Sequence, residues 1–176
     1  MINIEIKARC SDPANIRLVL EEKRAEFLGE DFQRDTYFHV ANGRLKLREG
    51  NIENALIFYR RPNEKGPKRS DVILYNPEPG TSMKSILVQA LGVDVIVEKK
   101  RRIYFIENVK FHIDDVVGLG RFVEIEAIDR DGRIAPDHLR SQCAEYLELF
   151  GIEDKDLISE SYSDLLRRAK RGEVPA

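Results

Sequence analysis

The chain has 176 residues, enough for one domain with a hydrophobic core, and 34% of them are charged. With 29 Lys and Arg against 31 Asp and Glu, the net charge of −2 argues against a general nucleic-acid-binding surface. No apolar run approaches the ~18 residues that a membrane-spanning helix needs, and the N-terminus lacks the apolar core of a signal peptide. We therefore expect a cytoplasmic protein, with no nucleic-acid or membrane partner, forming a single domain over residues 1–176.

The chain begins with a predicted strand and a predicted helix. Apolar and polar residues alternate over residues 2–9, which is typical of a strand with one apolar face. Asp12 and Pro13 are suited to a helix start, and apolar residues at helical spacing extend the predicted helix to a stop at Gly29.

Alternating segments dominate the rest of the chain. They predict strands at 35–40, 44–49, 55–61, 69–76, 93–106, 109–116 and 121–129. Asn42-Gly43 predicts a tight hairpin between the first two of these strands. Helical spacing predicts helices at 82–92, 136–151 and 161–170. We therefore expect an α+β domain with about eight antiparallel strands and with helices outside the sheet.

The polar faces of these strands are ionic. Arg44, Lys46 and Arg48 share one face of a strand, where they repel each other unless an anion lies among them. Glu124 and Glu126 form the opposite case and favour a cation between their carboxylates. The remaining strand faces carry Asn3, Glu5 and Lys7; Phe58 and Arg60; Lys99 and Arg101; and His112 and Asp114.

Each of these faces, taken alone, has an ordinary explanation as the solvated side of a sheet. Six strands with the same design favour a shared interior instead, because a closed antiparallel barrel would direct both charge types into one lumen. Arg and Lys bind phosphate oxygens, and carboxylates hold Mg²⁺ or Mn²⁺. A ring of at least five basic groups matches a polyphosphate better than a single phosphate.

The ordered set of motifs resembles the CYTH family, which joins class IV adenylyl cyclases, thiamine triphosphatases and inorganic triphosphatases. The matching stretches are Asn3-Ile4-Glu5-Ile6-Lys7, Arg44-Leu45-Lys46-Leu47-Arg48-Glu49, Val97-Glu98-Lys99-Lys100-Arg101, Asp114 and Glu124-Ile125-Glu126. Other segments, such as Tyr59-Arg60-Arg61-Pro62 and His112-Ile113-Asp114, look closer to the cyclase-like branch. The resemblance implies a closed eight-stranded antiparallel β-tunnel with helices packed outside.

The resemblance also implies residue roles. The implied triphosphate-binding residues are Lys7, Arg44, Lys46, Arg48, Arg60, Lys99 and Arg101. The implied ligands of Mg²⁺ or Mn²⁺ are Glu5, Glu124 and Glu126, with Asn3 as a neutral ligand. The implied catalytic residues are Glu5 and Asp114.

Several of these assignments have alternatives. Arg61 and Lys68 could replace Arg60, and a shift of one residue would place Lys100 and Arg102 inside in place of Lys99 and Arg101. Asn3 stands where the family has a glutamate, so it either joins the site or lies in solvent at the strand start. His112 is left out of the predicted site, because a lone histidine is more often structural.

Three functions follow as hypotheses. A cyclase would join the ribose 3′-oxygen of ATP to the α-phosphorus and release pyrophosphate, whereas a triphosphatase would direct water at the terminal phosphorus of thiamine triphosphate, tripolyphosphate or a nucleotide. A binding module would hold the polyphosphate without efficient turnover, and Asn3 keeps this third hypothesis open. In each case the expected partner is a small-molecule triphosphate, and an outer helix face or strand edge could pair two chains as a homodimer.

Overall fold

The computed structural model describes residues 2–78 and 80–172, which contain eight strands, four α-helices and one short 3₁₀ helix. The elements in chain order are β1 (Ile2–Arg9), α1 (Pro13–Glu22), β2 (Glu26–Phe38), β3 (Arg44–Glu49), β4 (Ala55–Arg60), β5 (Lys68–Tyr75), α2 (Met83–Leu91), β6 (Val93–Ile106), β7 (Val109–Val116), β8 (Gly120–Asp129), α3 (Pro136–Leu149), η1 (Asp154–Asp156) and α4 (Tyr162–Lys170). The strands close into an antiparallel barrel in the order β1-β5-β4-β3-β2-β6-β7-β8. The predicted α+β tunnel with outer helices is therefore confirmed.

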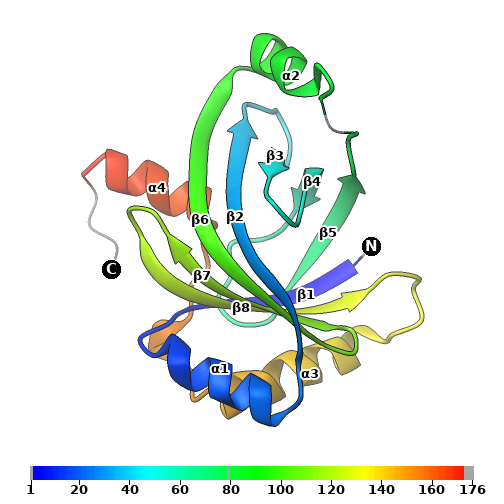
Figure 1. Ribbon diagram of the computed structural model, residues 1–176, viewed down its shortest axis with the longest axis vertical. Helices are drawn as coiled ribbons and strands as arrows, with labels where there is room; N and C mark the ends of the chain where they lie inside the picture. The colour runs from blue at the N-terminus through cyan, green and yellow to red at the C-terminus, as the bar shows by residue number, and fades with distance from the viewer. Residues whose placement is uncertain (1, 79, 173–176) are drawn as a thin grey trace.

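One wall of the barrel carries the main hydrophobic core on its outer face. In Figure 1, β1, β7 and β8 form this wall, and α1 and α3 pack beneath it. Because strand side chains alternate, Ile4 and Ile6 are buried against the helices while Glu5 and Lys7 face the barrel interior. The same alternation places Phe111 outside and His112 inside, so burying the apolar face orients the ionic one.

A second cluster fills one end of the barrel interior. Tyr162 and Leu165 of α4 pack there with Val97, Val116 and Phe122. Ser161 accepts a hydrogen bond from the Asp164 amide, which caps the start of α4 and fixes Tyr162 at the barrel end. The interior is therefore apolar at this end and ionic beyond it.

The first predicted helix is too long. In the structure α1 ends at Glu22. Arg24, two residues later, has a φ of +56°, and β2 begins at Glu26. The ring of Phe27 stacks against Tyr104 of β6 at 4.7 Å between centroids, so strand pairing outweighs the helical spacing that Phe27 completes. β2 consequently runs for 13 residues, and nine of them precede Asp35, where the predicted strand begins. No helix among residues 2–78 and 80–172 is long and apolar enough to span a membrane.

Candidate functional site

The barrel encloses a cavity of about 750 Å³ whose lining is strongly charged. Its charged lining residues are Lys7, Lys46, Arg48, Arg61, Lys99, Arg101, Lys110 and Arg130 together with Glu5, Glu53, Glu124 and Glu126. Asp35 and Asp114 lie behind this lining and pair with four of its cations, so eight cations face six carboxylates and a smaller excess of positive charge remains. Such an excess in a partly desolvated cavity favours a multiply charged anion.

A buried carboxylate organises the cations on one side. Asp35 of β2 is 1% exposed and accepts hydrogen bonds from Lys46 at 3.0 Å, from Arg48 at 2.9 and 3.1 Å, and from Lys99 at 2.7 Å. Burial alone would raise the pKa of Asp35, but these three cations outweigh it and hold that pKa well below its usual value. Three positive side chains from β3 and β6 are therefore held together around one negative charge.

A second buried network lies on the β6–β7–β8 side. Arg101 donates to Asp114 at 2.5 and 2.7 Å and to Glu124 at 2.7 Å, and Lys7 lies 3.0 Å from Glu124. Burial opposes ionisation of Glu124, but Lys7 and Arg101 hold its pKa well below the usual value. Tyr162 donates to Asp114 at 2.8 Å, and its ring lies 3.8 Å from the Lys7 nitrogen. The end cluster of the barrel therefore contacts the ionic site directly.

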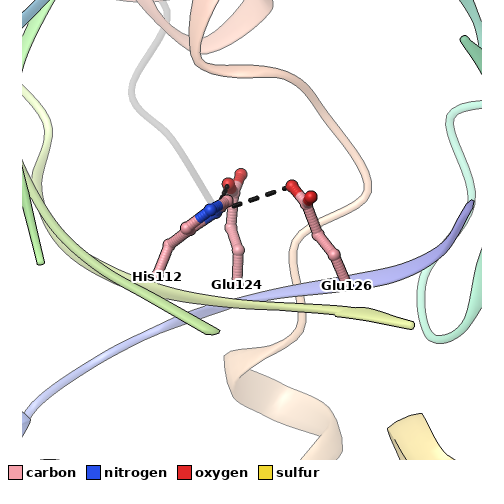
Figure 2. Close-up of side chains that lie close together, drawn as sticks. All are labelled: His112, Glu124 and Glu126. Carbon is pink, nitrogen blue, oxygen red and sulfur yellow. Dashed lines mark hydrogen bonds and ion pairs between the residues drawn. The ribbon is translucent and has the colours of Figure 1, made fainter. Parts of the chain in front are cut away.

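Acidic side chains gather on the wall formed by β1 and β8. Figure 2 shows His112, Glu124 and Glu126 projecting from β7 and β8 into the same space, and one ligand atom from each lies within 4.8 Å of the others. The His112 Nδ1 lies 3.1 Å from Glu124 and 3.5 Å from Glu126. Glu5 is paired directly with Glu126 in the β1–β8 register, which adds a further carboxylate to the group.

These donors fit a hard divalent cation. Glu5 and Glu126 are neighbouring like charges that line the cavity, and Asn3, two residues before Glu5, has a buried Oδ1 without a hydrogen-bond partner. Carboxylate and amide oxygens suit Mg²⁺ or Mn²⁺. Glu124 is the least available of the predicted ligands, because Lys7 and Arg101 already pair with it. Burial lowers the pKa of His112, which favours its neutral ring beside these carboxylates.

The placement of Arg60 in the interior is wrong. Tyr59 faces inward, so Arg60 faces outward, where it is exposed and lies over the ring of Phe58. Arg61 takes the interior position instead, lines the cavity and forms an ion pair with Glu5. Its side chain is 4% exposed, and its Nε and Nη2 have no hydrogen-bond partner. Arg61 is thus a buried cation with hydrogen-bond donors available for a ligand.

Two other predicted residues lie beside the cavity rather than on its lining. Arg44 is at the barrel end, where it donates to Asp164 of α4 at 2.9 Å and to Asn63 at 3.0 Å, and it lines an outer groove with Arg60. Asp114 lies behind Arg101 and is 1% exposed.

The remaining predicted site residues line the cavity. They are Asn3, Glu5, Lys7, Lys46, Arg48, Lys99, Arg101, Glu124 and Glu126. The register of β6 places Lys99 and Arg101 inside, whereas Lys100 and Arg102 point outward and pair with Glu30.

The sequence-based set omits several interior residues. Asp35, Gln33 and Tyr37 share the inner face of β2. Asp35 and Tyr37 lie within the predicted strand 35–40, so their spacing by two was an available signal, whereas Gln33 precedes that predicted strand. Lys110 is two residues before His112 on β7, so its inward position also followed from the strand period. Glu53 lies in the β3–β4 loop, where no periodic pattern marks it.

Apolar residues also line the cavity, interleaved with the charged ones. Ile57 and Leu74 are paired between β4 and β5, and Phe105 lies on β6, with Ile52 and Ile128 also lining the cavity. Asn54, Asn76 and Arg130 add polar groups to the same lining. The cavity lining thus offers cations for phosphate together with apolar and amide side chains for an attached organic group.

The closed eight-stranded barrel with helices outside has the architecture of the triphosphate tunnel fold, and comparison with known families agrees. Residues 1–162 match the model of the CYTH domain, so the chain belongs to the CYTH domain family. MJ0240 of Methanocaldococcus jannaschii, whose name gives it as a candidate adenylate cyclase, is 29% identical over 175 residues. The match covers 94% of this chain and 98% of that protein.

Solved structures show the same fold. The PH1012 protein of Pyrococcus horikoshii OT3 has a TM-score of 0.75 at 23% identity, covering 93% of this chain and 98% of that one. HpAC1 from Hippeastrum, described as a candidate adenylyl cyclase with a dominant triphosphatase activity, has a TM-score of 0.61 at 16% identity. That match covers 98% of this chain and 97% of the Hippeastrum chain. At these identities the likeness concerns the fold alone.

Proposed function

We propose that the protein is a metal-dependent enzyme that converts ATP into cyclic AMP and pyrophosphate inside the barrel. The observation that carries the proposal is the cavity of about 750 Å³, whose lining combines an excess of cations with apolar side chains. Inorganic tripolyphosphate would use only the cations, whereas a nucleoside triphosphate would use both kinds of lining residue. The full-length similarity to a candidate adenylate cyclase supports the same substrate.

In the proposed reaction the cations bind and orient the phosphate chain. Lys46, Arg48 and Lys99 lie on one side of the cavity, and Lys7, Arg61 and Arg101 line it as well. The 3′-oxygen bonds to the α-phosphorus as the bond to the bridging oxygen of pyrophosphate breaks, and the hydroxyl proton leaves. Negative charge grows on pyrophosphate, so fixed cations around it stabilise the transition state.

Two acidic residues receive different tasks in this proposal. Glu5 faces the cavity and is positioned to hold a cation with Glu126, or to accept a proton from the attacking group. Asp114 is a positioning residue, because both of its oxygens accept hydrogen bonds and the residue lies behind Arg101. A divalent cation at Glu5 and Glu126 would neutralise phosphate charge and ease proton loss from a coordinated oxygen.

The reaction products test the proposal. ATP, GTP, thiamine triphosphate and tripolyphosphate would each be incubated with Mg²⁺ or Mn²⁺, and phosphate, pyrophosphate and cyclic nucleotide would be measured separately. The expected result is cyclic AMP and pyrophosphate in equal amounts from ATP. The absence of turnover with every substrate would contradict an enzymatic function and leave polyphosphate binding.

Triphosphate hydrolysis is the second candidate. It is favoured by the Hippeastrum protein of the same fold, which combines a cyclase-like description with dominant triphosphatase activity. The binding requirements of the two reactions are the same, and they differ in the phosphorus that is attacked. Release of phosphate from ATP without cyclic nucleotide would select hydrolysis.

The affinity for the phosphate chain should depend on pH through Lys99. Burial lowers the pKa of Lys99 to about 7; Asp35 opposes this shift, while Arg48, Arg101 and Lys46 add to it. Lys99 is therefore charged below this pKa and neutral above it, so affinity should fall by up to about tenfold per pH unit above about pH 7. Titration calorimetry with tripolyphosphate between about pH 6 and about pH 9 measures the effect.

A Lys99→Arg variant provides the control, because a guanidinium stays charged over this range. Its affinity relative to the unmodified protein should rise steadily with pH, which also cancels the ionisation of the phosphate chain itself. Parallel pH profiles for the two proteins would show that Lys99 is not the titrating group.

A further inference from the structure

Glu53 is an interior carboxylate that lies outside the strand motifs. It belongs to the loop between β3 and β4, whose backbone is fixed where the amides of Ile52 and Glu53 donate to Asp31 at 2.9 and 3.0 Å. Asp31 is completely buried. The loop therefore holds the Glu53 side chain in the cavity rather than leaving it free in solvent.

The Glu53 carboxylate links side chains from three strands of the barrel. It accepts hydrogen bonds from Arg48 of β3 at 2.8 Å and from Gln33 of β2 at 2.9 Å, and it forms an ion pair with Lys110 of β7. The side chains of Arg48, Lys110 and Glu53 are 9%, 12% and 22% exposed, so this contact is largely desolvated. Two cations and an amide donor thus converge on one anionic group.

A phosphate oxygen can make the same contacts as this carboxylate. Glu53 gives Lys110 and Arg48, which also pairs with Asp35, a shared anion, and a terminal phosphate near neutral pH carries about twice the charge of a carboxylate. Glu53 also adds a negative charge to a cavity that must admit a polyanion. The Glu53 carboxylate therefore holds the two cations in position and also competes with the ligand for them.

We propose that Lys110 and Arg48 bind a phosphate group of the substrate in place of Glu53, whose carboxylate holds them in position until the substrate arrives. The inference rests on the proposed function and deepens it, because it adds Lys110 to the phosphate-binding residues. It also means that Glu53 lowers the affinity of the cavity for the phosphate chain. Replacing its charge should strengthen binding, the opposite of what loss of a ligand-contacting residue does.

Titration calorimetry with tripolyphosphate in the absence of divalent cations tests the inference. Glu53→Gln keeps the size and one acceptor oxygen, and we expect it to bind about tenfold more tightly. Lys110→Met should bind about tenfold more weakly, and adding Glu53→Gln to it should give a clearly smaller gain. Glu49→Gln is the matched control, since Glu49 is 40% exposed and pairs with Lys84 outside the cavity. Its affinity should stay within about twofold.

The outcomes separate this inference from the proposed function. If the unmodified protein binds tripolyphosphate and Glu53→Gln binds no more tightly than Glu49→Gln, the exchange is wrong while triphosphate binding stands. Unchanged affinity in Lys110→Met would show that Lys110 does not bind the phosphate chain. If the unmodified protein binds neither tripolyphosphate nor ATP, both the proposed function and the exchange are wrong. Should Lys110→Met fail to fold, the comparison of the two glutamate variants decides alone.

Discussion

Asp35→Asn should destabilise the fold by about 3 to 5 kcal/mol, because it removes the carboxylate that Lys46, Arg48 and Lys99 share and leaves Arg48 with Glu53 alone. Lys99 can lose its proton, since burial already lowers its pKa to about 7. Arg48 cannot, because a guanidinium stays charged. Urea unfolding followed by circular dichroism would give the free energy of unfolding of the variant and of the unmodified protein.

Asp71→Asn is the matched control for this prediction. Asp71 pairs with Arg69, and both side chains are more than half exposed, so the same change of charge should cost less than about 1 kcal/mol. Tripolyphosphate should restore part of the stability of Asp35→Asn by binding the freed cations in the folded state. Equal losses in the two variants would contradict the organising role of Asp35.

Arg61→Met should weaken ATP binding about 100-fold, which corresponds to about 2.7 kcal/mol. Arg61 is a buried cation that lines the cavity, and two of its nitrogens have no hydrogen-bond partner. Its loss would also leave Glu5 without its ion pair beside Glu126, which adds repulsion toward phosphate. Calorimetric titration with a non-hydrolysable ATP analogue measures the change in affinity.

Arg60→Met is the neighbouring control. Arg60 is exposed on the outer face of β4, so its removal should change affinity by less than about twofold at moderate salt. The pair of variants tests strand register as well as function. Equal weakening by both would mean that the interior is not the site of binding.

Much of the barrel followed from strand periodicity. The bounds of β3, β6 and β7 match the predicted segments. Asn42-Gly43 lies in the connection from β2 to β3, where Gly43 has a φ of +66°, but β2 ends at Phe38, so the turn is wider than the predicted tight hairpin. Alternation over eight strands also gave the inner face of most segments. It did so because one face of each must be apolar to pack against helices or the barrel end.

The sequence-based predictions were wrong where tertiary contacts determine the strand bounds and the interior residues. Helical spacing around Phe27 was overridden by pairing of β2 with β6, so the predicted strand began only at Asp35 and left out Gln33. Arg60 and Arg61 are adjacent, so periodicity alone could not choose between them once the strand was assumed to end at Arg61. Glu53 and Tyr162 reach the interior from a loop and from the start of α4, and only the closed fold shows that these segments meet the site.

The central claim, that the barrel interior holds the triphosphate of a nucleotide, is tested most directly by one equilibrium measurement. A non-hydrolysable ATP analogue with Mg²⁺ would be titrated into the unmodified protein and into Arg61→Met and Arg60→Met. We expect one site per chain, lost or strongly weakened in Arg61→Met and retained in Arg60→Met. No binding to the unmodified protein, or binding that both variants retain in full, would contradict it.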